Sequence, residues 1–294
     1  MPNRRSEIHM HSTFSDGEFS PEQLVNIAKE NDVTLLSLTD HDTFEGIPEF
    51  LQSAESKGIE AFPGIEITVK FHDFNIHVLA YFKNYQSIDE ELIQKVKEMT
   101  EIREKRMIEL IKRIDAVIPE KFRGLVEFDN VKRAAEGVLA RPHLAREMVR
   151  LGIVSSTSQA FDKYLVKYNV QRENLDAATA ISLIRKSNGV PVMAHPGERS
   201  YSLICPEKGR KKENAPKLLE ELTEMGLLGL ECHYPYQERM GTVQYFIELA
   251  NKFGLIITGS RDFHGFYSHQ QANVFGTTEI EPIFLEQFQA VWKN

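Results

Sequence analysis

The sequence predicts an α/β fold of seven strands with a helical segment inserted after the fourth. Short apolar stretches of strand length alternate with amphipathic helices in the first part of the chain, and the alternation resumes near residue 176. Between residues 84 and about 175 no convincing strand pattern occurs, and the apolar spacing is helical. Strands separated mainly by helices favour a parallel sheet, either a closed barrel or an open sheet.

Each expected strand is a short apolar segment next to a helix or a turn. The seven segments are residues 7–9, 35–38, 59–67, 74–81, 190–194, 227–232 and 255–259. The clearest helix start is at Ser20, an N-cap residue followed by Pro21 at the first helical position and Gln23 at the capping-box position.

The helical insertion begins with a long charged helix. It is expected from residue 88 to about 118, where Pro119 ends it. A second helix is expected to follow Arg141-Pro142-His143 and to end at Gly152. We therefore expect a catalytic unit of residues 1–83 and 176–294, with residues 84–175 inserted as a helical domain that contributes to substrate binding.

Composition excludes several classes of protein. The 294 residues are 41% hydrophobic and 27% charged, which is ordinary for a globular protein. Two cysteines cannot build a disulfide framework, the first residues lack an apolar signal stretch, and no window is apolar enough to span a bilayer. These features predict a cytoplasmic protein without membrane association, and they indicate no obligate protein partner.

The net charge of −8 does not favour a polyanionic partner, although bound cations reverse the local field in their own pocket.

Histidines and carboxylates lie beside nearly every expected strand, usually just past its end. The carboxyl ends of strands form the ligand-binding face of barrels and parallel sheets, so side chains from distant parts of the chain can converge there. The two-residue spacing of the first histidine pair puts both imidazoles on one face of a strand. Mixed nitrogen and oxygen ligands suit Zn, Mn or Fe. The nine candidate metal ligands are His9, His11, Asp16, His41, Glu66, His77, His195, Asp262 and His264.

Taken one at a time, these residues also have structural explanations. Asp16-Gly17 is a common turn pair, and His77 among apolar residues is more often a satisfied core histidine. For Glu66 the alternative is an ordinary ion pair, and for His195 it is a residue at the start of a loop. We expect Asp40 and Asp42 to orient imidazoles and not to bind metal.

In this order, the motifs resemble the polymerase and histidinol phosphatase (PHP) family of metal-dependent phosphoesterases. The matching stretches are His9-Met10-His11-Ser12 with Asp16-Gly17, Leu38-Thr39-Asp40-His41-Asp42, Gly64-Ile65-Glu66, His77, Ala194-His195-Pro196 and Asp262-Phe263-His264-Gly265. The resemblance implies a distorted seven-stranded β/α barrel with two or three divalent metal ions. It further implies three ligand sets: His9, His11, Glu66 and Asp262; Glu66, His77 and His195; and Asp16, His41 and His264.

Within the family, the chain is most similar to enzymes that act on nucleoside 3′,5′-bisphosphates and trim short RNA in the 5′-to-3′ direction. The grounds are the length, the insertion after the fourth strand, and Arg141-Pro142-His143. The resemblance implies that Arg141 and His143 contact substrate phosphate, and a guanidinium at a helix N-terminus is a good anion site. The alternative is a surface arginine before a helix-starting proline. The family's serine directly before the last aspartate is replaced here by Arg261, either a further phosphate contact or a sign of a shifted turn.

We therefore expect a hydrolase that acts on a phosphorylated small molecule, nucleotide or short oligonucleotide through a metal-bound hydroxide. The residue that protonates the leaving group stays open. Alternatives are a histidinol-phosphate phosphatase on the same scaffold, a metal-dependent amidohydrolase or deaminase, and a non-catalytic binding module. The basic run from Lys208 to Lys212 is either a contact for an oligonucleotide tail or a solvated loop.

Overall fold

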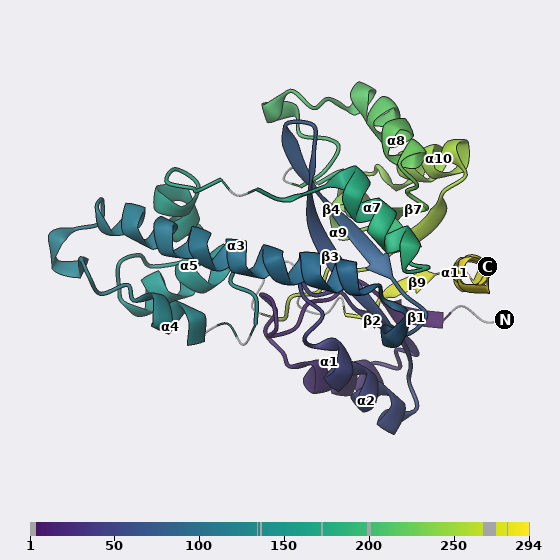
Figure 1. Ribbon diagram of the computed structural model, residues 1–294, viewed down its shortest axis with the longest axis horizontal. Helices are drawn as coiled ribbons and strands as arrows, with labels where there is room; N and C mark the ends of the chain where they lie inside the picture. The colour runs from purple at the N-terminus through teal and green to yellow at the C-terminus, as the bar shows by residue number, and fades with distance from the viewer. Residues whose placement is uncertain are drawn as a thin grey trace.

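A mixed β-sheet forms the centre of the fold, and a helical insertion projects from one side of it (Figure 1). The computed structural model describes residues 4–133, 135, 137–171, 173–198, 201–266, 275–280 and 282–293. Within these residues nine strands pair in the order β8-β7-β6-β4-β3-β2-β1-β9, with β5 beside β3. The strands are β1 (Arg4–Glu7), β2 (Leu35–Leu38), β3 (Glu60–Phe71), β4 (Phe74–Tyr81), β5 (Leu175–Asp176), β6 (Val190–Met193), β7 (Gly229–His233), β8 (Ile256–Gly259) and β9 (Thr278–Ile280).

All seven expected strands occur, but the expected parallel arrangement is wrong at β4. This strand runs antiparallel to both β3 and β6, whereas β1–β2–β3 and β6–β7–β8 pair in parallel. The physical reason is the link between β3 and β4, which consists of His72 and Asp73 alone. Two residues can join antiparallel strands, whereas a parallel pair needs a crossover of a dozen or more.

The outer strands of the order β8-β7-β6-β4-β3-β2-β1 are joined to each other just past their last residues, which closes the sheet. Beyond β1 and β8, Met10 and Phe263 form a parallel bridge. The backbone N–H of His11 donates to the carbonyl of Phe263 (2.8 Å), and the N–H of Phe263 donates to the carbonyl of His9 (3.0 Å). This contact closes the distorted seven-stranded barrel and places His9 and His11 on the same side of the chain, on either side of the buried Met10.

Helices cover the outside of the barrel. The first begins where expected: the Ser20 hydroxyl accepts from the N–H of Gln23, whose side chain accepts from the N–H of Ser20 (2.8 Å). No helix in the described part of the chain is long and apolar enough to cross a membrane. The barrel helices are α1 (Pro21–Glu30), α2 (Ile47–Lys57), α7 (Ala177–Lys186), α8 (Ala215–Glu224), α9 (Pro235–Arg239), α10 (Val243–Phe253) and α11 (Pro282–Lys293).

The insertion is built on one long helix, α3 (Glu90–Asp115), which runs from the barrel to the far end of the molecule (Figure 1). Its first half contributes Leu92, Val96 and Met99 to the barrel core. Its second half, from Met107 onward, packs in a separate apolar core. The remaining helices of the insertion are α4 (Phe128–Arg133), α5 (Arg141–Arg150), α6 (Thr157–Ala160) and a π-helical turn (Phe161–Leu165). The domain limits at residues 84 and 175 stay a prediction, and α3 is shared between the two cores.

Candidate metal centre

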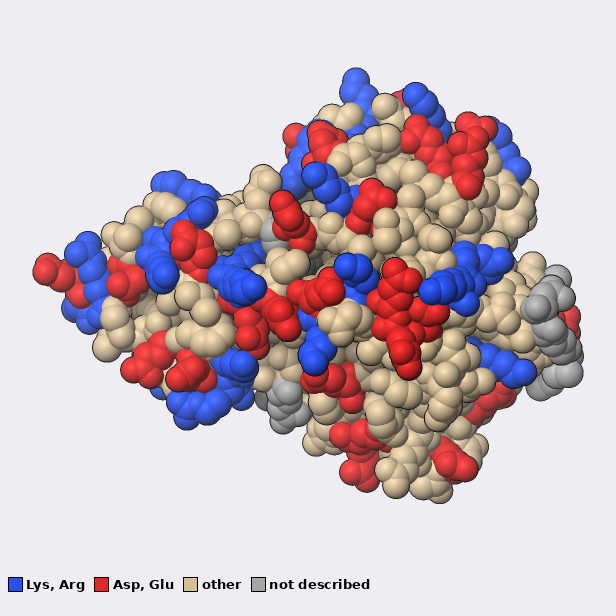
Figure 2. All heavy atoms as spheres, viewed as in Figure 1, with Lys and Arg blue, Asp and Glu red and all other residues tan. Residues whose placement is uncertain are grey.

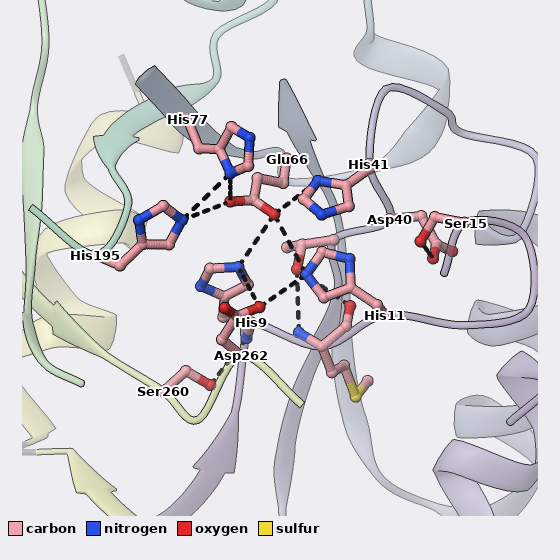
Figure 3. A network of polar contacts seen from close by, with 12 residues as sticks. His9, His11, Ser15, Asp40, His41, Glu66, His77, His195, Ser260 and Asp262 are labelled. Carbon is pink, nitrogen blue, oxygen red and sulfur yellow. Dashed lines mark hydrogen bonds and ion pairs between the residues drawn. The ribbon is translucent and has the colours of Figure 1, made fainter. Parts of the chain in front are cut away.

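Glu66 on β3 is a fully buried carboxylate surrounded by imidazoles (Figure 3). Its Oε1 lies 2.7 Å from Nδ1 of His77 on β4 and 3.1 Å from Nε2 of His195, which follows β6. The two imidazole nitrogens are themselves 3.3 Å apart. Because β3, β4 and β6 are neighbours in the sheet, the fold brings these three side chains together from widely separated parts of the chain.

The second oxygen of Glu66 faces three more histidines. Its Oε2 lies 2.9 Å from Nδ1 of His41, 3.3 Å from Nε2 of His11 and 3.4 Å from Nε2 of His9. Asp262, just past β8, approaches from the other side, with Oδ1 3.0 Å from His11 Nε2 and 3.2 Å from His9 Nε2. We call His9, His11, Glu66, His77, His195 and Asp262 the central group; all are buried except Asp262, whose side chain is 15% exposed.

A second cluster lies beside the central group and is more open to solvent. Oδ1 of Asp16 is 3.2 Å from Nε2 of His264 and 3.8 Å from Nε2 of His41. The side chains of Asp16, His41 and His264 are 11%, 13% and 26% exposed, whereas those of His9 and Glu66 are 0% exposed. We call Asp16, His41 and His264 the peripheral group. All nine side chains expected at the site therefore converge.

The charges of the cluster are strongly coupled. Burial alone would raise the pKa of Glu66, but His77, His41 and His9 outweigh burial and hold this pKa well below its usual range. Burial would lower the pKa of His264, yet Asp16 and Asp262 raise it to about 10. The pKa of His195 is likewise raised against burial to about 9, chiefly by Glu66. For His77, burial prevails and lowers the pKa to about 4.

The donor atoms of the site fit divalent metal ions. His9 Nε2, His41 Nδ1 and Glu66 Oε2 are buried and make no hydrogen bond, although they converge on one another. Buried polar atoms are nearly always hydrogen-bonded, so such a cluster is consistent with metal ions bound between its members. Four overlapping sets of side chains have ligand atoms within 4.8 Å of one another, which is consistent with a multinuclear site. Nitrogen and oxygen ligands of this kind are accepted by Zn, Mn and Fe.

Glu231 on β7 orients two of the imidazole-bearing residues, and the sequence analysis did not include it. Its Oε1 accepts from Nδ1 of His9 (2.9 Å), and its Oε2 accepts from the backbone N–H of His195 (2.8 Å). The first bond turns His9 Nε2 toward the centre, as outer carboxylates commonly do for metal-binding histidines. A lone carboxylate in the strand Gly-Leu-Glu-Cys-His was the available sequence signal.

Tyr234 and Glu198 form a second support that the sequence analysis missed. The Tyr234 hydroxyl lies 2.8 Å from Oε2 of Glu198 and 2.9 Å from Oδ2 of Asp262, and its single proton serves one carboxylate at a time. Glu198 Oε2 is also 3.9 Å from Nδ1 of His195, and the Glu198 side chain is 42% exposed at the rim of the site. No pattern in the sequence distinguishes these two residues from an ordinary tyrosine and glutamate.

Asp40 acts differently from what the sequence suggested. Asp40 accepts hydrogen bonds from the N–H of Ser12 (2.7 Å) and from the hydroxyls of Ser12 (2.6 Å) and Ser15 (2.5 Å). It therefore holds the loop between His11 and Asp16, and the expectation that it orients an imidazole directly is wrong. Asp42 accepts from the Thr68 N–H (2.7 Å) and from the guanidinium of Arg103 on α3 (2.8 Å from Nε).

Three of the six described non-glycine residues with a positive φ lie where strands lead into the site. His195 and Asp262 have φ angles of 29° and 53°, and Asp42, next to His41, has a φ of 50°. Non-glycine residues in this region cost about 1–3 kcal/mol each and persist only where the surroundings hold them. Glu231 holds the N–H of His195, and Tyr234 holds the Asp262 carboxylate.

Arg141 and His143 lie at the start of α5, on the insertion. Arg141 is the first helical residue, and its guanidinium is 5.5 Å from the centre of the Phe161 ring. His143 is buried, and its Nδ1 accepts from the N–H of Ala140 (3.0 Å). Burial and nearby Arg146 lower the pKa of His143 to about 4, against an opposing effect of Asp16. The ring is therefore neutral at pH 7 and within electrostatic reach of the peripheral group.

Further arginines of the insertion lie close to these residues. Arg106 on α3 has its pKa lowered to about 10, first by burial and then by Arg141. Burial also lowers the pKa of Arg146, while Asp16 and Glu18 act in the opposite direction. The outer surface is mixed in sign: on the face in Figure 2, lysines and arginines of the insertion are interspersed with aspartates and glutamates.

Arg261 and the basic run are both engaged with the protein. The Arg261 guanidinium pairs with Oε2 of Glu238 on α9 (2.5 Å), and its N–H donates to the buried Glu7 (3.0 Å). Arg210 lies 4.3 Å from the Phe74 ring centre, and Lys212 lies 4.1 Å from that of Tyr245. The run is thus anchored on aromatic side chains, and its contact with an oligonucleotide stays a prediction.

Comparison with known proteins agrees with this geometry. Residues 7–233 match the model of the PHP domain family. A 5′-3′ exoribonuclease of Haemophilus influenzae is 34% identical over 257 residues, covering 79% of this chain and 91% of that protein. A 3′,5′-nucleoside bisphosphate phosphatase of Chromobacterium violaceum is 26% identical over 263 residues, covering 88% and 86%. A solved structure from Bifidobacterium adolescentis, provisionally named a metal-dependent phosphoesterase, superposes with a TM-score of 0.81 at 24% identity, covering 99% and 97%.

A barrel that gathers imidazoles and carboxylates at one end defines the class of the protein: it is a metal-dependent phosphoesterase, a hydrolase. The chain belongs to the PHP domain family, because the family model matches most of its length. The solved structure, below 25% identity, shows the shared fold. The resemblance read from the sequence motifs is thereby confirmed.

Proposed function

We propose that this phosphoesterase hydrolyses phosphate esters of nucleotides, either a nucleoside 3′,5′-bisphosphate or a short 5′-phosphorylated RNA taken in the 5′-to-3′ direction. Both relatives named above act on such substrates by their names. The single observation that carries the proposal is the position of the buried carboxylate–imidazole cluster beside the arginine-bearing insertion. A substrate with two phosphates has a partner for each: the metal centre for the reacting one and the insertion for the other.

In this proposal the central and peripheral groups hold two or three divalent ions, Mn, Zn or Fe. His9, His11, Glu66 and Asp262 hold one ion, and their ligand atoms lie within 4.8 Å of one another. Glu66, His77 and His195 hold a second, and Asp16, His41 and His264 hold a third. When bound, such ions activate a water as the nucleophile and offset negative charge on the phosphoryl oxygens.

The protein's own residues orient the substrate around this centre. Arg141 supplies a planar, permanently charged donor at a helix N-terminus, which suits a phosphate oxygen pair. His143 is neutral, so its free ring nitrogen offers a hydrogen bond without adding charge. Glu231 and Tyr234 keep His9 and Asp262 in place, so that little reorganisation is needed when the substrate arrives.

The test combines metal analysis with a substrate panel. The wild-type protein, loaded with Mn²⁺, is assayed on a 3′,5′-bisphosphate, a short 5′-phosphorylated RNA, histidinol phosphate and an amide. We expect turnover on the two nucleotide substrates and loss of turnover in the His9→Ala/His11→Ala double variant. Near-normal turnover by a metal-depleted double variant would overturn the proposal. A preference for histidinol phosphate would instead favour the alternative phosphatase on the same scaffold.

Arg141→Ala tests the role of the insertion in substrate binding. We expect KM for the bisphosphate to rise about 10- to 100-fold with a smaller change in kcat, because a charge-assisted hydrogen bond contributes about 1.5–3 kcal/mol. KM for the matching monophosphate should change little. Arg150→Ala, at the exposed far end of α5 where the guanidinium pairs with Glu147, is the matched control. Equal effects of both substitutions would contradict the assignment of Arg141.

A further inference from the structure

Arg103 on α3 reaches from the insertion into the barrel. Its side chain is buried, and Nε donates to Oδ2 of Asp42 (2.8 Å), with Nη2 in contact with the same oxygen. Nη2 also lies 3.3 Å from the hydroxyl of Thr68, and Nη1 lies 3.5 Å from the carbonyl of Leu139. One guanidinium thus links the long helix, the loop after β2 and the segment that leads into α5.

Asp42 is the residue next to His41, and its conformation depends on these contacts. Its φ of 50° is unfavourable for a residue with a side chain. Its N–H donates to the carbonyl of Glu66 (2.9 Å), and its own carbonyl accepts from the hydroxyl of Thr100 on α3 (3.3 Å). Asp42 therefore fixes the direction in which the His41 side chain leaves the backbone. Residues of α3 hold Asp42 in turn, through its side chain and through its carbonyl.

The insertion meets the site at a second loop as well. The N–H of Val138 donates to the carbonyl of Phe14 (2.6 Å), and Phe14 lies between His11 and Asp16. At Gly137 a Cβ atom would lie 2.1 Å from the same carbonyl, so the close approach requires glycine. The insertion thus contacts two of the three loops that carry the peripheral group, one beside Asp16 and one beside His41.

We infer that the insertion sets the geometry of the peripheral group, with Arg103 as a positioning residue that acts through Asp42 on His41. This inference rests on the metal-binding role proposed above. A buried ion pair is weak evidence for stability, because the cost of desolvating both charges offsets most of their attraction. Its directional bonds nevertheless fix the register of the two parts that it joins. The insertion then has two roles: it binds substrate, and it holds the loops that carry Asp16 and His41.

The experiment measures metal binding by Arg103→Lys and Asp42→Asn in the full-length protein. Mn²⁺ is titrated calorimetrically into metal-free protein, and bound metal is counted by elemental analysis. We expect one equivalent to bind about 10- to 100-fold more weakly than in the wild type, the usual effect of removing a partner that orients a ligand. The remaining equivalents should bind as before, because the central group makes its contacts within the barrel.

Two control variants separate positioning from stability. Arg113→Lys lies on the same helix but contacts Glu109 and the carbonyl of Asn169, so metal binding should not change. Leu110→Ala removes volume from the core of the insertion and lowers the melting temperature of the protein without changing any group that contacts Asp42. A variant that is destabilised yet binds all equivalents normally shows that loss of stability alone does not weaken the site.

Kinetics give a second readout that a purely structural role would not move. At limiting Mn²⁺, kcat of Arg103→Lys should fall, and excess Mn²⁺ should restore it. Wild-type affinity for every equivalent in folded Arg103→Lys, or equal weakening of all equivalents, overturns the inference while the proposed function stands. A wild-type protein that binds no metal overturns the proposed function, and the inference with it.

Discussion

The central and peripheral groups differ in how firmly the fold holds them. The central group lies on or directly beside paired strands, and its carboxylate Glu66 is shared among five imidazoles with no exposure to solvent. The peripheral group lies on loops, its member His264 is the most exposed of the nine residues at 26%, and the insertion contacts the loops of Asp16 and His41. Rigid, preorganised ligands bind tightly, whereas loop-borne ligands exchange their ion more readily. Metal affinity should therefore fall from the centre of the site to its edge.

Replacing the shared carboxylate should have the largest effect. We expect Glu66→Gln to lose at least about a thousandfold in kcat/KM, since metal ions contribute several kcal/mol to such reactions and the variant removes a ligand common to more than one set. Elemental analysis should show loss of more than one equivalent. Glu60→Gln, at the exposed start of the same strand, is the control. Loss of a single equivalent in Glu66→Gln would mean that the carboxylate is not shared.

The second largest effect should be the change of metal affinity with pH. The pKa values of His195 and His264, about 9 and about 10, lie above the roughly 6.5 of a free imidazole, so both rings are protonated at pH 7.5 and a metal must displace those protons. Affinity should rise about a hundredfold per pH unit for two displaced protons and level off above pH 10. The measurement is calorimetry in buffers that differ in ionisation enthalpy.

The same pKa values set the sign for folding of the metal-free protein. Because both are raised in the folded state, their contribution to stability is complete below about pH 6.5 and is lost as the pH rises through 9 and 10.

Replacing His264 by Gln should lower by one the number of protons released on metal binding, because His264 is the ring of the peripheral group that loses a proton to the metal. Unchanged proton release would show that this ring does not bind the ion.

Asp16→Asn should have a smaller effect than Glu66→Gln, because Asp16 belongs to the peripheral group alone. We expect one equivalent of metal to bind about 10- to 100-fold more weakly, with kcat restored by excess Mn²⁺. Asp32→Asn, on the exposed turn after α1, serves as the control. Loss of every equivalent in Asp16→Asn would remove the distinction between the two groups.

Tyr234→Phe should have the smallest effect. It removes a hydroxyl that supports Asp262, and a neutral-to-charged hydrogen bond contributes about 1.5–3 kcal/mol at most, part of which water or Glu198 can replace. We expect a several-fold fall in kcat with metal content unchanged, measured against Tyr236→Phe on the neighbouring α9. A loss comparable to that of Asp16→Asn would place Tyr234 among the groups that bind substrate or metal.

The sequence predicted the ligand cluster because strand ends in this architecture share one face, which makes residues such as His9 and Asp262 neighbours despite their separation. It did not predict that β4 is antiparallel, because the third strand was expected to end at residue 67, whereas β3 continues to Phe71 and leaves only His72 and Asp73 as the link. Glu231 had a signal, as a lone acid in an apolar strand. Glu198 and Tyr234 had none, because their contacts arise only from the way the loops pack.

The position of Arg103 in the sequence also indicates a buried role, but this pattern can be recognised only once the structure is known. It stands four residues after Met99 and four before Met107, so it occupies the buried stripe of α3. A charged residue in such a stripe needs a buried partner, but the sequence does not say which one. Asp42, more than sixty residues earlier in a different unit, becomes the partner only once the barrel and insertion have packed together.

The sharing of α3 between two cores limits how this chain can be cut and recombined. A deletion at residues 84–175 would remove Leu92, Val96 and Met99 from the barrel interior and leave a gap in its packing. Exchange of the insertion with that of a relative is better placed beyond Arg103, because Thr100 and Arg103 still contact Asp42 of the barrel. In evolution, substrate range would then vary with the outer half of this helix, while its inner half stays with the catalytic scaffold.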